Sequence, residues 1–212
     1  TGSLTAASTD FLTVSDVPGS HSDFGAPHGY TSNFWNTAIG TNTLNETTEP
    51  LYNLHINSGI IYAGTTAAED CTAIGGGGNG FGQVFIHGGI VTAVATTAGT
   101  AIGGGMGHSA QGGPGEVHIT GGNVYAYNFA NSWNIPSSAI GGGGSYSANA
   151  SSGAVNISGG YIYAYSALGT AIGGGSSRYI TGGNATINIS GGHIVAKSDH
   201  SNGIGGGTGG SN

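Results

Sequence analysis

Basic side chains are nearly absent from this chain. Lys and Arg together number 2 among 212 residues, against 9 acidic residues and 8 His. The formal net charge of −7 therefore comes from scarce bases rather than from abundant acids. Nucleic acids and anionic membranes are held by clustered Lys and Arg, so we expect neither as a partner.

Cysteine is as scarce as the bases, since Cys71 stands alone. A single thiol cannot form a disulfide within the chain, so the fold must rely on backbone pairing and packing. The sequence has no run of about 18 apolar residues, and we expect no membrane insertion. Because the first residue is Thr1 rather than Met, we expect a processed precursor or a trimmed chain that is secreted or held at the cell surface.

Glycine is the abundant residue, with 46 copies. A chain rich in Gly, Ser, Thr and Asn is sometimes disordered, but disordered chains combine low hydrophobicity with high charge. Here only 5% of the residues are charged, and apolar residues recur at regular positions. We therefore expect a folded chain.

Two short signatures alternate along the sequence. The first has the form VFIHGGIVTA, begins at Val84, and recurs 30 to 38 residues apart. The second has the form TAIGGGG, begins at Thr72, and recurs between copies of the first. An early fragment, TAIGTN from Thr37, suggests a further eroded coil. Constant signatures separated by variable segments are typical of a repeat protein with loops inserted between strands.

Within each unit apolar and polar residues alternate with period 2, turn at Gly-Gly, and alternate again. This pattern predicts two short strands joined by a tight corner, because an amphipathic helix has a different period. A unit so small cannot bury its apolar side alone, whereas equivalent strands stacked about 4.8 Å apart form a continuous core. We expect an all-β fold, a parallel β-helix of five to six coils, and crossover geometry favours the right-handed form. The predicted core isoleucines are Ile74, Ile102, Ile140, Ile172 and Ile204 in the second signature, and Ile86, Ile119, Ile157 and Ile189 in the first.

The alternation also predicts which residues face outward. In the second signature the small residue before each isoleucine should form a flat face, either free to contact another surface or covered by loops. These residues are Ala73, Ala101, Ala139, Ala171 and Gly203. The first signature should present two outward rows. The first row is His55, Phe85, His118, Asn156 and Asn188, and the second is Tyr62, Thr92, Tyr125, Tyr163 and Val195.

The two ends of the chain differ in pattern. Residues 1–50 lack the full repeat and contain an aromatic group of Tyr30, Phe34 and Trp35, so we expect an N-terminal cap or an assembly segment. Residues 51–212 should form the solenoid domain. Its last coil has no covering segment in the sequence, and an open parallel edge is a template for pairing. We therefore expect head-to-tail self-association, as in a filament.

The combination of AIGGG with V-x-I-x-GG-x-V-x-A resembles the Gly-rich repeats of large secreted and cell-surface, adhesin-like proteins of anaerobic bacteria and archaea. The resemblance covers about residues 51–212 and excludes the irregular first 50. It implies a surface-exposed β-solenoid, with carbohydrate binding in some cases, and specifies no activity.

Outward tyrosines supply a candidate ligand-binding surface. Aromatic rings on a flat sheet bind the faces of sugars and bury a large area at low entropic cost. The alternative is that the rings pack across strands and stabilise the sheet. The candidate residues are Tyr125, Tyr127, Tyr161, Tyr163 and Tyr165.

Other sites are weakly indicated. No His or Cys pattern matches a metal centre, and we expect no cofactor. A polysaccharide lyase would need basic residues, of which the chain has only Arg178 and Lys197, and a glycosidase would need two carboxyl groups in one cleft. An ice-binding threonine ladder would be interrupted at Ser138 and Asn202. We expect a non-catalytic structural or adhesive extracellular module, with a carbohydrate-binding module as the alternative.

Overall fold

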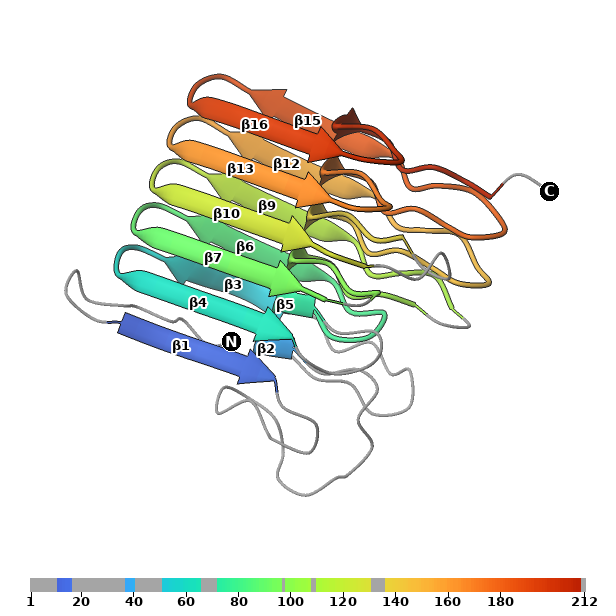
Figure 1. Ribbon diagram of the computed structural model, residues 1–212, viewed down its shortest axis with the longest axis horizontal. Helices are drawn as coiled ribbons and strands as arrows, with labels where there is room; N and C mark the ends of the chain where they lie inside the picture. The colour runs from blue at the N-terminus through green and yellow to red at the C-terminus, as the bar shows by residue number, and fades with distance from the viewer. Residues whose placement is uncertain are drawn as a thin grey trace.

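The computed structural model describes residues 11–16, 37–40, 51–65, 72–96, 98–107, 110–130 and 136–210. These residues form three parallel β-sheets that share one axis, so the fold is an all-β solenoid, as the sequence predicted (Figure 1). The part of the chain described here contains no helix long and apolar enough to span a bilayer.

Each coil contributes one strand to each sheet. Sheet A comprises β1 (Phe11–Asp16), β4 (Ile60–Thr65), β7 (Ile90–Ala95), β10 (Asn123–Asn128), β13 (Tyr161–Ser166) and β16 (His193–Ser198). Sheet B comprises β2 (Thr37–Gly40), β5 (Thr72–Gly75), β8 (Ile102–Gly103), β11 (Ile140–Gly141), β14 (Ile172–Gly173) and β17 (Ile204–Gly205). Sheet C comprises β3 (Leu51–Ile56), β6 (Gly82–Ile86), β9 (Gly115–Ile119), β12 (Gly153–Ile157) and β15 (Ala185–Ile189).

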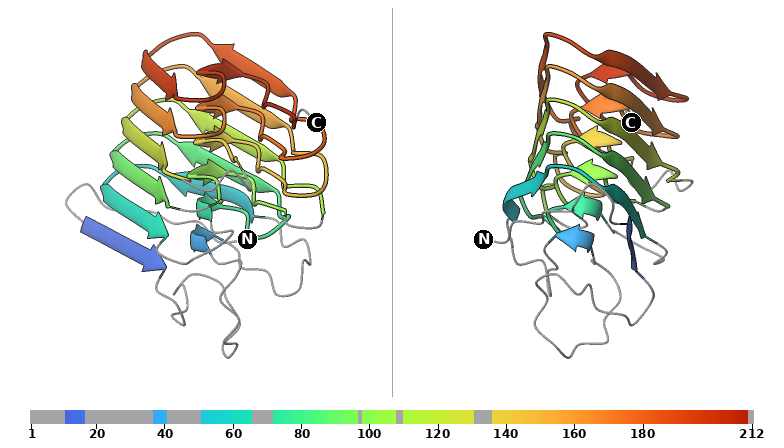
Figure 2. Two further views of the ribbon diagram at one scale, coloured as in Figure 1. Left: turned by 45° about the vertical axis from the view of Figure 1, so that its right-hand side comes forward. Right: turned by 90° about the vertical axis from the view of Figure 1, so that its left-hand side faces the viewer.

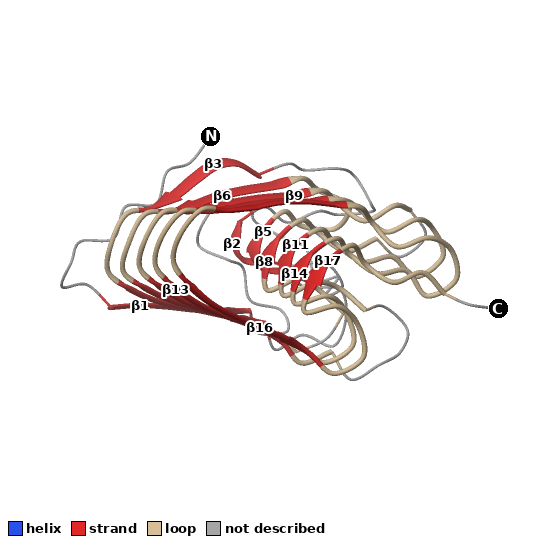
Figure 3. Ribbon diagram, turned by 90° about the horizontal axis from the view of Figure 1, so that it is seen from above, coloured by secondary structure: helices blue, strands red, loops and turns tan. Residues whose placement is uncertain are grey.

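The solenoid is right-handed. Seen from above, with the later coils nearer the viewer, the chain passes counterclockwise from sheet C to sheet A and on to sheet B (Figure 3). Figure 2 shows from two further sides how the strands of each sheet stack along the axis. The solenoid has about four turns, slightly fewer than the five to six coils expected, because the five strands of sheet C enclose only four full turns between them.

Equivalent positions of the repeat lie opposite one another in neighbouring strands. Ile140 of β11 is paired with Ile102 on one side and with Ile172 on the other. In sheet C the same holds for Val155, which lies between Val117 and Ile187. The register shifts once, in β3 between Leu51 and Leu54, and is otherwise regular in the pairs of sheets A, B and C, so side chains of one kind form rows along the axis.

The inward rows form a single apolar core that runs through the coils. The side chains of Ile74, Ile102, Ile140 and Ile172 are fully buried, and those of Ile86, Ile119 and Ile157 are at most 1% exposed. The sequence also predicted burial of Ile189 and Ile204, and this is wrong, since they are 44% and 46% exposed. They lie in β15 and β17, each paired with a neighbouring strand on one side only.

Sheet B is not an exposed flat face. Its alanines, which the alternation placed outward, are fully buried and belong to the same core cluster as the isoleucines: Ala73, Ala101, Ala139 and Ala171. Figure 3 shows sheet B inside the cross-section, flanked by the loops that enter and leave it. Of the two alternatives that the sequence left open, coverage by loops is therefore the one observed.

Glycine is required where the chain bends sharply and where coils approach closely. Gly122, in the corner between sheets C and A, has φ of +87°. Gly141 in sheet B has φ of +132°, and a Cβ atom there would lie 2.0 Å from the carbonyl oxygen of Gly173 in the next coil. A Cβ at Gly122 would also lie 2.8 Å from the carbonyl oxygen of Gly89, so both positions disfavour larger residues through conformation and through space.

Two strands of the first 50 residues take part in the solenoid. β1 pairs with β4 in sheet A, and β2 pairs with β5 in sheet B. The aromatic group Tyr30, Phe34 and Trp35 lies outside the described residues, so a capping or assembly role for this segment stays a prediction.

Candidate functional site

The outward face of sheet A carries the predicted tyrosines. Alternation along β10 and β13 turns every second residue outward, and the register places Tyr125 opposite Tyr163 and Tyr127 opposite Tyr165. Tyr161 begins β13 on the same face and lies opposite Asn123. All five tyrosines are partly exposed, so the structure brings the whole predicted set together on one surface.

The aromatic rings contact one another diagonally across the two strands. The centroids of Tyr125 and Tyr161 are 5.9 Å apart, and those of Tyr127 and Tyr163 are 5.6 Å apart, with ring planes tilted by 49° and 41°. Phe129, which the sequence analysis missed, continues the alternation beyond β10 and lies 5.6 Å from Tyr165. These six residues form what we call the aromatic strip: Tyr125, Tyr127, Phe129, Tyr161, Tyr163 and Tyr165.

The tilted rings stabilise the sheet through cross-strand contacts. They also leave part of each ring accessible, and Phe129 is 47% exposed. Burial raises the pKa of the Tyr127 phenol, and the neighbouring phenols, that of Tyr163 foremost, act in the same direction. The strip is therefore an uncharged surface of rings and hydroxyl groups.

Charged groups occur at one margin of the aromatic strip. The Tyr165 hydroxyl donates a hydrogen bond of 2.6 Å to Asp199, and the Lys197 ammonium lies 3.7 Å from the same carboxylate. The hydrogen bond raises the pKa of Tyr165 and lowers the pKa of Asp199. The charges of Lys197 and Asp199 cancel, and the Tyr165 phenol is neutral. This margin therefore adds no net charge to the face.

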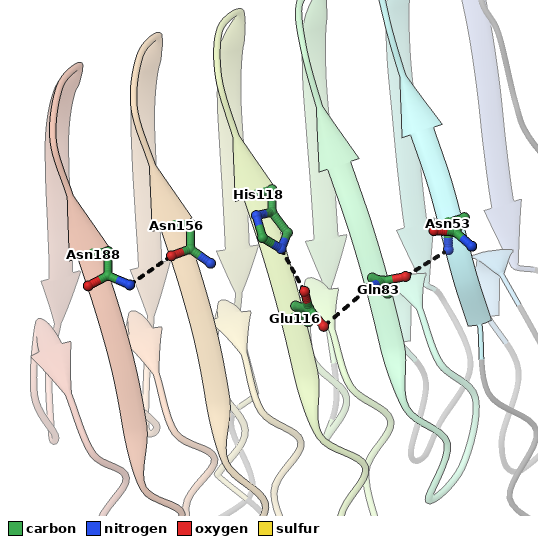
Figure 4. A network of polar contacts seen from close by, with 6 residues as sticks. All are labelled: Asn53, Gln83, Glu116, His118, Asn156 and Asn188. Carbon is green, nitrogen blue, oxygen red and sulfur yellow. Dashed lines mark hydrogen bonds and ion pairs between the residues drawn. The ribbon is translucent and has the colours of Figure 1, made fainter.

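The outward face of sheet C is polar and is formed by the other predicted row. Figure 4 shows how its amides and acids link neighbouring strands. The Asn188 amide donates to the Oδ1 of Asn156 at 2.9 Å, and the Gln83 amide donates to the Oε2 of Glu116 at 3.1 Å. The same Glu116 accepts a contact of 2.7 Å from the Nε2 of His118.

Histidines form a second cluster on sheet C. The rings of His55, Phe85 and His118 stack in successive strands, with centroids 4.5 and 4.6 Å apart and planes within 12° of parallel. His87, directly after β6, lies 3.0 Å from His55 between their Nε2 and Nδ1 atoms, and its Nδ1 lies 3.1 Å from the Thr120 hydroxyl. Sequence analysis placed His55 and His118 in one row but gave no role to His87, which lies outside that row.

One of the two basic residues lies in the loops between sheets B and C. The Arg178 guanidinium lies 5.3 Å from the ring centroid of Tyr146 and 4.8 Å from that of Tyr179. Hydrogen bonds from Tyr179 and Arg178 lower the pKa of Tyr146. These are cation–π contacts of the kind that fix a loop against its neighbour in the next coil.

The described residues do not bring together the groups that a metal centre, a glycosidase acid pair or an exposed threonine ladder would need. No group of three or more His, Cys, Asp or Glu there could hold a metal ion. The two acids whose side chains are described, Glu116 and Asp199, belong to different faces of the solenoid. The threonines of the ice-binding hypothesis, Thr72, Thr100 and Thr170, are buried.

The chain matches no family model, no curated protein and no solved structure.

Proposed function

We propose that this chain is a non-catalytic structural and adhesive module of a secreted or cell-surface protein. The continuous stack of parallel coils supports this proposal, because it holds rows of outward side chains in fixed register over the length of the solenoid. A scaffold of this kind presents the same chemistry repeatedly along its axis, which suits contact with extended polymers or surfaces.

The aromatic strip is the observation that carries the adhesive part of the proposal. Six accessible or partly accessible rings lie side by side on sheet A without an uncompensated charge among them. Aromatic side chains lose little conformational entropy on contact and dominate binding energies at interfaces. Their place on a regular sheet gives the surface a rigid base.

A carbohydrate-binding module is the second candidate, and the same strip favours it. The tyrosines combine apolar ring surface with hydroxyl groups, as recognition of a neutral pyranose requires. Because the rings are tilted, part of each ring face is turned toward the neighbouring ring. We therefore expect a bound sugar to contact ring edges and hydroxyl groups in addition to stacking on ring faces.

Retention on insoluble polysaccharides tests this surface. We expect the double variant Tyr125→Ala, Tyr163→Ala to lose retention by about tenfold, because two partly exposed rings are removed. Thr92→Ala is the matched control, since Thr92 lies in the same row opposite Tyr125 and carries no ring. Equal retention of the wild type and the double variant would leave the tyrosines with a packing role only.

Electron microscopy of the purified chain separates the two candidates. Fibres are expected if coils stack between copies of a structural module, and dispersed particles retained on polysaccharide are expected from a binding module. Release of new reducing ends from any polysaccharide that is bound would contradict the non-catalytic proposal.

A further inference from the structure

Histidine is the main source of positive charge available to this protein. Adding eight protons to its eight histidines would change the formal charge from −7 to +1, whereas Lys and Arg supply only 2 charges. Imidazole is the side chain whose unperturbed titration falls between pH 5 and 8. The position of the histidines therefore determines where positive charge develops when the medium becomes acidic.

Three histidines gather on the outward face of sheet C. His55 lies in β3, His87 directly after β6, and His118 in β9, so neighbouring coils bring together residues that are 31 to 63 positions apart in sequence. We call these residues, with Phe85 between them, the histidine cluster. All of its side chains are at least partly exposed.

The geometry of His55 and His87 makes their contact sensitive to protonation. Their nitrogens are 3.0 Å apart, their ring centroids 5.3 Å apart, and their planes are within 11° of parallel. This geometry describes two nearly coplanar rings that meet head-on, with one N–H donating to one lone pair. When both rings are protonated, no acceptor remains between them and the two facing N–H groups repel each other, so the rings must turn apart unless an anion accepts a hydrogen bond from each.

Neighbouring groups offset part of the repulsion between the two added charges. Phe85 lies between the rings of His55 and His118, and a cation over an aromatic face is stabilised. The Thr120 hydroxyl accepts a hydrogen bond from the protonated Nδ1 of His87. Among the described residues, Glu116 is the acid on this face, and its carboxylate already accepts contacts from His118 and Gln83.

We propose that the histidine cluster is a binding surface for acidic polysaccharide that binds when its imidazoles are protonated, so that binding increases as the medium is acidified. The carboxylates of uronate residues would accept charge-assisted hydrogen bonds from the imidazolium groups. The rings of His55 and His118 cover the two faces of Phe85, so the ring edge of Phe85 and the amides of Gln83 and Asn156 are the groups on this face that suit the apolar edge and the hydroxyls of a sugar. Nucleic acid is disfavoured, because it requires clusters of permanently charged Lys and Arg.

Binding to polygalacturonate at pH 5.0 and pH 7.5, in low salt, tests the proposal. We expect the wild type to bind at pH 5.0 and to bind about tenfold more weakly at pH 7.5, the order expected for two or three exposed ion pairs. Binding at pH 5.0 should weaken as salt is added. The double variant His55→Gln, His87→Gln should lose most of the difference between the two pH values, since only His118 of the cluster, which contacts Glu116, remains.

The control variant is His193→Gln. His193 begins β16 on the outward face of sheet A and stacks on Tyr161, so this change removes one histidine from the other face and should leave the pH dependence intact. Circular dichroism of each variant at both pH values establishes that the solenoid remains folded.

Several results would overturn the proposal. These are an absence of binding at pH 5.0, an unchanged pH dependence in the double variant, equal binding to neutral dextran, or equal binding to single-stranded DNA. The tyrosine variants leave the histidine cluster unchanged, so failure here is distinguishable from failure of the adhesive function proposed for sheet A.

Discussion

Removal of one side chain from the centre of the isoleucine row measures how much the stack depends on its core. Ile140 is fully buried and lies between Ile102 and Ile172. Ile204 occupies the equivalent position in β17 and is 46% exposed. The variants Ile140→Ala and Ile204→Ala therefore make the same chemical change in one row, in different environments.

The expected loss differs about threefold between the two sites. Replacing a buried Ile by Ala costs about 2–5 kcal/mol, and the cost is high where the cavity cannot collapse. Strand spacing fixes both neighbours of Ile140, so we expect about 3–4 kcal/mol. At Ile204 about half of the side chain is already in water and no closed cavity forms. Three carbon groups at about 0.8 kcal/mol each, reduced by half, give about 1 kcal/mol.

Urea denaturation followed by circular dichroism measures this difference. Because coils of a solenoid unfold partly independently, the whole transition is recorded and the fit is accepted as two-state only where tyrosine fluorescence gives the same curve. Equal losses for Ile140→Ala and Ile204→Ala would refute the reasoning, since they would show that a central coil is no better packed than the last one.

Two further predictions concern glycine and the charged margin of the aromatic strip. Gly141→Ala should destabilise the protein by more than about 1 kcal/mol, because φ there is +132° and the new Cβ would meet a backbone oxygen of the next coil. Gly64→Ala, where the new Cβ would meet only the Tyr62 side chain, is the control in urea titrations, and equal losses would contradict the argument. Asp199→Asn should lower the pKa of Tyr165, observed as phenolate absorbance appearing at lower pH, because the carboxylate now raises that pKa. In the wild type the hydrogen bond between Tyr165 and Asp199 stabilises the fold at neutral pH. The contribution of Tyr165 is lost as the pH rises through its raised pKa, above about 10. The contribution of Asp199 is lost as the pH falls through its lowered pKa, below about 3.9. An unchanged phenolate titration in Asp199→Asn would remove the pair from this account.

The architecture was predictable because the same pattern of apolar and polar residues recurs in every copy of the repeat. Period-2 alternation around Gly-Gly identified the strands of sheets C and A, and the recurrence of the signatures identified their parallel stacking. The register then follows from burial, since a slip of one residue would expose the whole inward row. The outward rows beginning at His55 and Tyr62 are found where the alternation placed them.

The surroundings of sheet B were not predictable in the same way. In β11 and β14 the strand is only two residues long, and alternation over so few residues cannot distinguish a face in water from a face under a loop. Ala139 is fully buried and belongs to the apolar core cluster. Its small size, which suggested an exposed flat face, suits close packing within a covered one equally well.

The histidine cluster shows why the candidate site was only partly visible in the sequence. His55, His87 and His118 form no local motif, and in most folds such separations would place them apart. In a solenoid, residues separated by about one repeat lie in neighbouring coils and can contact each other. His87 belongs to the cluster because its ring, at the corner after β6, contacts His55 of the preceding coil. In this fold a surface is formed by residues at equivalent positions of successive repeats, which lie in neighbouring coils. A single substitution at such a position therefore alters a surface to which several coils contribute.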